Sequence, residues 1–164
     1  MSIPVKIINY SPVAMVGCSV SMSYENNKTF ELWKSFMSRK KELTNTIGPN
    51  LYSIQDYPES FLKSGFNPEV YFTKWACIEV EANSNIPEGF KAFNFHGGLY
   101  AVFSHKGDHQ KFIENWQWIL NWWLPQSNYK LDQRVHFEIL GPKYKNNSHD
   151  SEEKICIPIV PRID

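Results

Sequence analysis

The sequence predicts an α+β fold in which two tandem strand–helix–strand–strand units share one twisted antiparallel sheet, with two main helices packed near each other. Three observations support this prediction. Short runs alternate apolar and polar residues, two longer runs carry apolar residues at helical spacing, and these runs follow in the same order twice. The pseudo-repeats cover about residues 3–82 and 88–160 of a single domain, 1–164, at a period of roughly 85 to 90 residues.

The first unit begins with an extended run, VKIINYSPVAMVGCSVS, which a Ser-Pro turn or bulge interrupts at Ser11 and Pro12. A helix follows in TFELWKSFMSRKKEL, with Asn27 as its cap and basic residues at its end. Two strands, LYSIQDYP and YFTKWACIEVE, close the unit. The apolar residues at helical spacing in the helix are Phe30, Trp33, Phe36 and Met37.

The second unit repeats this order. FKAFNFHGGLYAVFSHKG contains two extended runs, which are broken at His96-Gly97-Gly98. HQKFIENWQWILNWWLP is a helix that we expect to stop at Pro125, and the strands RVHFEIL and KICIPIV complete the unit. One face of this helix is predicted to lie in the core and carries Phe112, Trp116, Ile119, Leu120 and Trp123.

Aromatic residues, at 15% with six tryptophans, are the compositional outlier. Trp118 and Trp122 lie off the predicted core face of the second helix. A helix with tryptophans around much of its circumference is either sandwiched between other elements or borders a cavity, because tryptophan suits a half-open wall. The sequence therefore allows an aromatic pocket beside this helix.

Charge and cysteine content narrow the class of protein. Lysine plus arginine equals aspartate plus glutamate, 17 each, so nothing indicates a nucleic-acid surface. Cys18, Cys77 and Cys156 are isolated, which predicts buried free thiols in a reducing cytosol. The sequence shows no secretion signal and no membrane-spanning apolar run. We expect a cytoplasmic monomer or weak dimer that needs no cofactor and binds neither membrane nor nucleic acid.

The sequence offers little evidence of a catalytic or metal-binding motif. His105 and His109 are four residues apart, but Gly107 and Asp108 lie between them and no third ligand is evident, so we expect no metal site. The sequence has no nucleophile elbow, phosphate loop or dinucleotide fingerprint.

Two glutamates, Glu79 and Glu138, lie in strands among apolar residues. Each is either on the solvent face of an antiparallel sheet or inside an aromatic cavity. In a cavity, a carboxylate alone is costly when ionised, and a bulky organic cation would supply the missing counter-charge. The spacing of the residues leaves these two alternatives open.

An ordered series of motifs resembles the GyrI-like family, the effector-binding domains of AraC-type and MerR-type multidrug regulators, which also occur as stand-alone proteins. The motifs are FTKWACIEVE, IPEGF, GLYAVFSHKG, WWLPQSNYKLDQRVHFEI and SEEKICIPI, within Val5 to Ile159. The resemblance implies a central pocket with Glu138 facing it and meeting cationic drugs. It further implies ligand-binding positions on the pocket wall at Tyr52, Trp75, Tyr100, Trp116 and Trp123.

The sequence departs from the family pattern at Val135, at Leu140 and at His96-Gly97, and we expect these departures to alter the rim of the pocket. We also expect no helix-turn-helix segment before the domain. Three functions fit the resemblance. The first is a stand-alone binder of lipophilic cationic or aromatic compounds, linked to drug sensing or transcription regulation. The second is a hydrolase of strained-ring genotoxic compounds, with Glu138 as general base and Tyr100 assisting. The third is a gyrase-inhibitor-like interaction protein.

Overall fold

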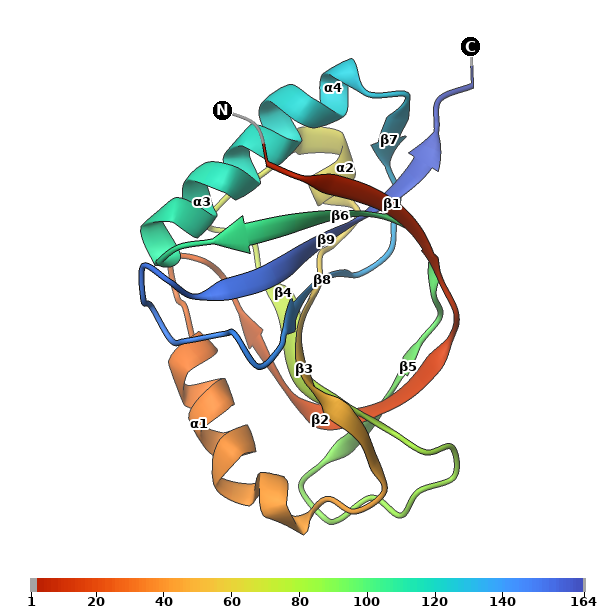
Figure 1. Ribbon diagram of the computed structural model, residues 1–164, viewed down its shortest axis with the longest axis vertical. Coiled ribbons are helices and arrows are strands. Elements are labelled where there is room, and N and C mark those ends of the chain that lie inside the picture. Colours follow the sequence, from red (N-terminus) through yellow and green to blue (C-terminus); the bar gives the residue numbers. More distant parts are fainter. Residues whose placement is uncertain (1–2, 164) are drawn as a thin grey trace.

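Strands make up more of the chain than helices do in the computed structural model, which describes residues 3–163 (Figure 1). Nine strands form an antiparallel sheet in the order β1-β6-β9-β8-β3-β4-β2-β5, with β7 paired to β9. The strands are β1 (Val5–Tyr10), β2 (Val13–Met22), β3 (Thr46–Asp56), β4 (Phe72–Val80), β5 (Lys91–Phe95), β6 (Gly98–Lys106), β7 (Tyr129–Leu131), β8 (His136–Leu140) and β9 (Glu152–Pro161).

Two main helices accompany the sheet, together with several short ones. The helices are α1 (Thr29–Arg39), followed by the 3₁₀ turn η1 (Lys40–Glu42); α2 (Ser60–Ser64); and α3 (His109–Trp118), continued by the π-helical turn η2 (Ile119–Trp123) and by α4 (Leu124–Gln126). This arrangement confirms the predicted fold class. The short elements α2 and β7 were not predicted. The boundaries of the two pseudo-repeats stay a prediction.

Each half of the chain supplies a strand to the other half. β1 pairs with β6, and β5 pairs with β2. The predicted interruptions lie at Ser11-Pro12 and at the glycine pair, where Gly97 has a φ of 75° and Gly98 a φ of 110°. A side chain at Gly97 would also meet the Tyr10 carbonyl oxygen at 2.3 Å, so this turn requires glycine.

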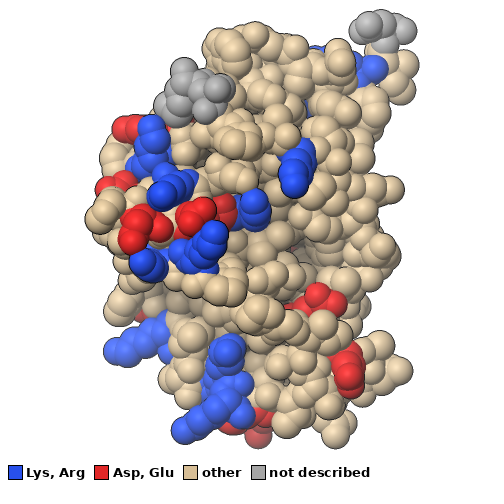
Figure 2. All heavy atoms as spheres, in the orientation of Figure 1, with Lys and Arg blue, Asp and Glu red and all other residues tan. Residues whose placement is uncertain are grey.

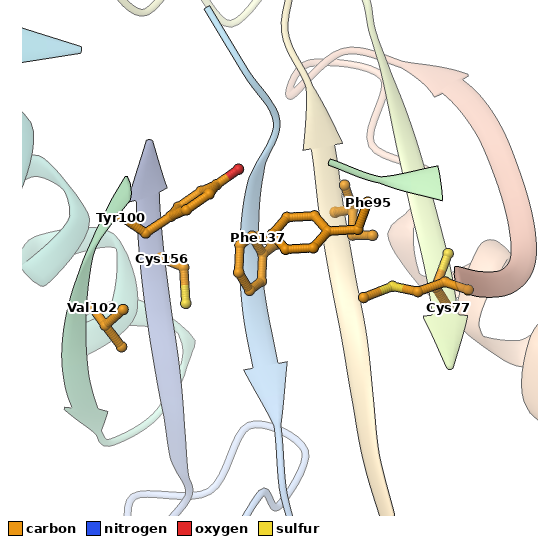
Figure 3. Packing of buried hydrophobic residues seen from close by; sticks show 8 residues of the cluster. Cys77, Phe95, Tyr100, Val102, Phe137 and Cys156 are labelled. Carbon is orange, nitrogen blue, oxygen red and sulfur yellow. The ribbon is translucent and has the colours of Figure 1, made fainter. Parts of the chain in front are cut away.

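The sheet has a helix-covered face and an opposite face. On the helix-covered face, α1 packs against Ala76 and Ile78, and α3 packs against Phe103 and Ile155. Figure 1 shows α1 and α3 on the same side of the strands. The opposite face has its own buried cluster, in which the rings of Tyr100, Phe137 and Phe95 converge (Figure 3). These two packed layers leave the strands of the central sheet buried on both sides.

The predicted core row of α1 is wrong in part. Leu32 and Phe36 are the buried residues of this helix, whereas Phe30 is 72% and Met37 is 50% exposed. Successive residues turn by about 100° around a helix, so Phe30 lies on nearly the opposite side from Leu32. Leu32 and Phe36, which are four residues apart, therefore define the side of α1 that faces the sheet.

The second helix is closer to its prediction. All five predicted residues pack in the cluster beneath it, together with Leu124. The helix extends through a π turn and ends at Gln126, one residue beyond Pro125, which is tolerated in the first turn of α4. Trp118 also packs against this cluster, and its ring stacks on the exposed ring of Trp122 with centroids 5.3 Å apart.

Acidic and basic side chains interleave on the face shown in Figure 2, in keeping with their equal numbers. Within residues 3–163, no helix is both long and apolar enough to cross a bilayer. The three cysteines are free; Cys77 and Cys156 are buried as predicted, and Cys18 is half-buried.

Candidate functional site

Glu138 lies on the helix-covered face, in the middle of the sheet. Its strand, β8, runs between β9 and β3, and Glu138 pairs directly with Ile155 on one side and Ser53 on the other. Ser53 pairs in turn with Ala76, which packs under α1. Because directly paired residues point to the same face, this row of side chains runs from the α3 side to the α1 side. Glu138 is only 7% exposed, so it is not a solvated strand residue.

Few polar groups compensate the Glu138 carboxylate. Gln55 Nε2 donates a hydrogen bond of 2.9 Å to Glu138 Oε1. Burial raises the pKa of Glu138, while the positive charge of Lys74 and hydrogen bonds from Gln55 and Ser53 oppose the rise. Partly buried Glu153 has its pKa raised to about 8, first by burial and then by the negative charge of Glu138. The carboxyl groups of Glu138 and Glu153 thus lie close enough that they cannot easily be ionised at the same time.

Lys74 lies beside Glu138 and Glu153 and completes a set of three charged side chains, which we call the polar cluster. It pairs with Gln55 across β3 and β4, and it is 8% exposed. Burial lowers the pKa of its ammonium group, and the charges of Glu138 and Glu153 oppose that shift. Among residues 3–163, no side chain forms a hydrogen bond or a close ion pair with the Lys74 ammonium.

An aromatic cluster lies next to these polar groups on the same face. Tyr57 stacks on Phe61 with ring centroids 4.3 Å apart, and its edge meets His136, two residues before Glu138, at 4.9 Å. Burial raises the pKa of the Tyr24 and Tyr57 hydroxyls, which bond to each other, and the charge of Glu138 adds to the rise. We define the aromatic cluster as Tyr24, Tyr57, Phe61, Phe66, Phe72 and Trp116.

A cavity of about 210 Å³ opens within the aromatic cluster. Five of the six cluster residues line it, and the sixth, Trp116, contacts the lining residue Phe66 with ring centroids 5.3 Å apart. Tyr57 links the cavity to the polar cluster, since it lines the cavity and packs on His136, two residues before Glu138. The cavity is smaller than the several hundred cubic ångströms expected of a drug-sized site.

The structure brings together some of the predicted ligand-binding residues. Glu138 and Trp116 lie on the same face, and Trp116 contacts the aromatic cluster. Trp123 lies on this face too, but it packs edge-on against Phe103, 4.9 Å away, inside the α3 core.

Three predicted residues, Tyr52, Trp75 and Tyr100, lie on the opposite face. The Tyr100 hydroxyl donates to the Val135 carbonyl oxygen at 2.7 Å and is buried in the core shown in Figure 3. These three residues do not share a wall with Glu138 in this structure, because neighbouring residues along a strand point to opposite faces; their role in ligand binding stays a prediction. The structure does not bring Tyr100 and Glu138 together.

Sequence reasoning missed Lys74 and most of the aromatic cluster. Lys74 carried a usable signal, because it alternates with Phe72, Ala76 and Ile78 on the apolar face of its strand. Tyr57 lies at the end of the predicted strand LYSIQDYP, and Phe61 and Phe66 lie in and just after α2, between that strand and the next predicted one. Their contacts arise from tertiary packing only.

The histidines show other roles. His105 is buried, and its Nδ1 lies 2.9 Å from Asn115 Nδ2. His109 begins α3. Residues 3–163 contain no group of three or more histidine, cysteine or acidic side chains that could hold a metal ion.

Comparison with known proteins identifies a family and a related regulator. Residues 6–159 match the family described as Cass2, integron-associated effector binding protein. The transcriptional regulator BrlR of Pseudomonas aeruginosa is 24% identical over 155 residues, which cover 94% of this chain and 54% of BrlR. The chain thus spans about half the length of this curated relative.

Solved structures share the fold. A Vibrio cholerae integron cassette protein, VCH_CASS2, has a TM-score of 0.67 and 20% identity, with 95% of each chain covered. SAV2435 bound to tetraphenylphosphonium has a TM-score of 0.70 and 12% identity, covering 96% of this chain and 94% of that one.

Proposed function

This chain belongs to the Cass2 family of integron-associated effector-binding proteins, and on that premise we propose that it binds lipophilic aromatic cations between Glu138 and the aromatic cluster. As a small-molecule effector-binding domain, it is similar to the ligand-binding domains of regulators. We infer that binding serves drug sensing linked to transcription regulation.

The observation that carries this proposal is the buried Glu138 carboxylate beside an aromatic cluster. Glu138 is 7% exposed and its side chain accepts one close hydrogen bond, from Gln55. A buried carboxylate attracts a cation when, as for Glu138 among the described residues, the nearby lysine charge forms no close ion pair with it. Each aromatic face that contacts the cation would add about 0.5 to 2 kcal/mol. Charge and ring faces together favour a bulky organic cation over a metal ion.

The present cavity restricts how such a ligand enters. Its volume of about 210 Å³ falls short of the roughly 300 to 1,000 Å³ of drug-sized sites. Phe66 lines the cavity and is 44% exposed, so its ring reaches the solvent. Side chains of the aromatic cluster must therefore shift to admit a large cation.

Glu138→Gln tests the proposal with tetraphenylphosphonium as the probe. The substitution keeps the size and hydrogen-bonding capacity of the side chain but removes its charge. We expect calorimetric titration to show an affinity at least tenfold weaker, a loss of about 1.4 kcal/mol or more. Glu79→Gln is the matched control, since Glu79 is half-buried on the opposite face and should leave the affinity unchanged. Equal affinity in Glu138→Gln and the unmodified protein would refute the proposal.

A further inference from the structure

Lys74 is the least expected residue of the site. An ammonium group in the site of a cation-binding protein repels the ligand, and it is costly to bury without a partner. Lys74 nevertheless lies 8% exposed between the two parts of the site. Its strand neighbour Phe72 belongs to the aromatic cluster, and its cross-strand neighbour Gln55 donates to Glu138.

A second polar group of the site also lacks a partner. His136 is 3% exposed and contacts Tyr57, and its Nδ1 atom has no hydrogen-bond partner among the described residues. The site therefore holds two polar groups without a hydrogen-bond partner among the described residues, the Lys74 ammonium and His136 Nδ1, on the face that carries Glu138. Buried polar groups are normally satisfied, so their partners are sought in what the site binds.

The charge of the site leads to the same conclusion. With Lys74 charged and either Glu138 or Glu153 protonated, the three side chains together carry no net charge. A simple cation keeps the site neutral only by displacing the proton held by one of the two carboxyl groups, whereas a ligand that brings both signs of charge keeps it neutral with that proton in place. Losing that proton, or carrying a net charge in a poorly solvated site, is unfavourable, so the second kind of ligand is favoured.

We propose that this site is selective for aromatic zwitterions, with Glu138 binding the cationic group of the ligand and Lys74 binding its carboxylate or other anionic group. The proposal rests on the binding function proposed above and specifies its ligand class. His136 Nδ1 supplies a further polar contact next to Tyr57.

Two phosphonium probes of matched shape test the selectivity at pH 7. Carboxybutyl(triphenyl)phosphonium is a zwitterion, and pentyl(triphenyl)phosphonium is a cation with the same aromatic group and a chain of similar length. We expect the unmodified protein to bind the zwitterion at least tenfold more tightly. In Lys74→Met this preference should vanish or reverse, because the zwitterion loses its partner and the cation loses a repulsive charge.

Controls separate the possible failures. Lys34→Met removes an exposed lysine from α1 and should keep the preference of the unmodified protein. Lys74→Gln, which keeps a donor without the charge, should also lose most of the preference, and it carries the test if Lys74→Met does not fold. A preference for the pentyl probe, or an equal preference in both Lys74 variants and the unmodified protein, would overturn the selectivity alone. Failure of both probes to bind the unmodified protein would overturn the binding function itself.

Discussion

Binding of a simple cation should release a proton from the buried carboxyl groups. Glu153 has a pKa of about 8 in the free protein, so about nine-tenths of it is protonated at pH 7. A cation beside Glu138 favours the ionised carboxylates and lowers this pKa. Up to about 0.9 proton should therefore leave for each tetraphenylphosphonium bound at pH 7.

The pH dependence of the affinity follows from this release. The free protein holds more protons than the complex, so binding becomes tighter as the pH rises and levels off above the pKa of Glu153 in the free protein, near 8. Below that point the affinity should change by up to about tenfold per pH unit. The charged groups that act on Glu153 are Glu138 of β8 and Lys74 of β4, and His105 of β6 pairs with it across the sheet.

Calorimetry in buffers with different ionisation enthalpies counts the released protons directly. Glu153→Gln should reduce the number markedly, whereas Glu152→Gln, at the neighbouring and more solvated position, should not. Identical binding enthalpies in phosphate and Tris buffer at pH 7 would refute the reasoning, because they would mean that no proton leaves.

Two further predictions concern the helices. Trp116→Ala should weaken the binding of tetraphenylphosphonium by about 0.5 to 2 kcal/mol in a calorimetric titration. Trp123→Ala should mainly lower the stability of the fold, by about 3 kcal/mol, because its ring packs on Phe103. The reverse pattern would contradict the assignment of Trp116 to the site and of Trp123 to the core. Phe36→Ala should cost about 3 to 5 kcal/mol in urea denaturation, whereas Phe30→Ala should change stability by less than about 0.5 kcal/mol, and similar losses in both would show that the buried row of α1 is misassigned.

The order of the main helices and strands was predictable because it rests on local periodicity and turn residues. The breaks at Pro12 and at Gly97-Gly98 follow from the backbone geometry of proline and glycine alone. Short elements such as α2 carry too few residues to show a period. The boundaries of the larger elements could be placed only to within a few residues.

The composition of the site was predictable only in part. Alternation places Glu138 and Phe137 on opposite faces, but it does not show which face the helices cover. That depends on strand pairing, which puts Tyr52 and Trp75 beside Phe137 and leaves Lys74 on the side of Glu138. A lysine within an apolar alternation was the local sign of this face.

The central pairing of β3 with β8 has a consequence for how the chain responds to its ligand. Tyr57 and Lys74 come from the first 80 residues of the chain, whereas Trp116 and Glu138 come from beyond residue 91. Neither half therefore contains a complete site. A bound ligand acts as a non-covalent crosslink between them, and its binding free energy opposes any opening of the β3–β8 seam. We therefore expect occupancy of the proposed site to increase the resistance of the two halves to separation.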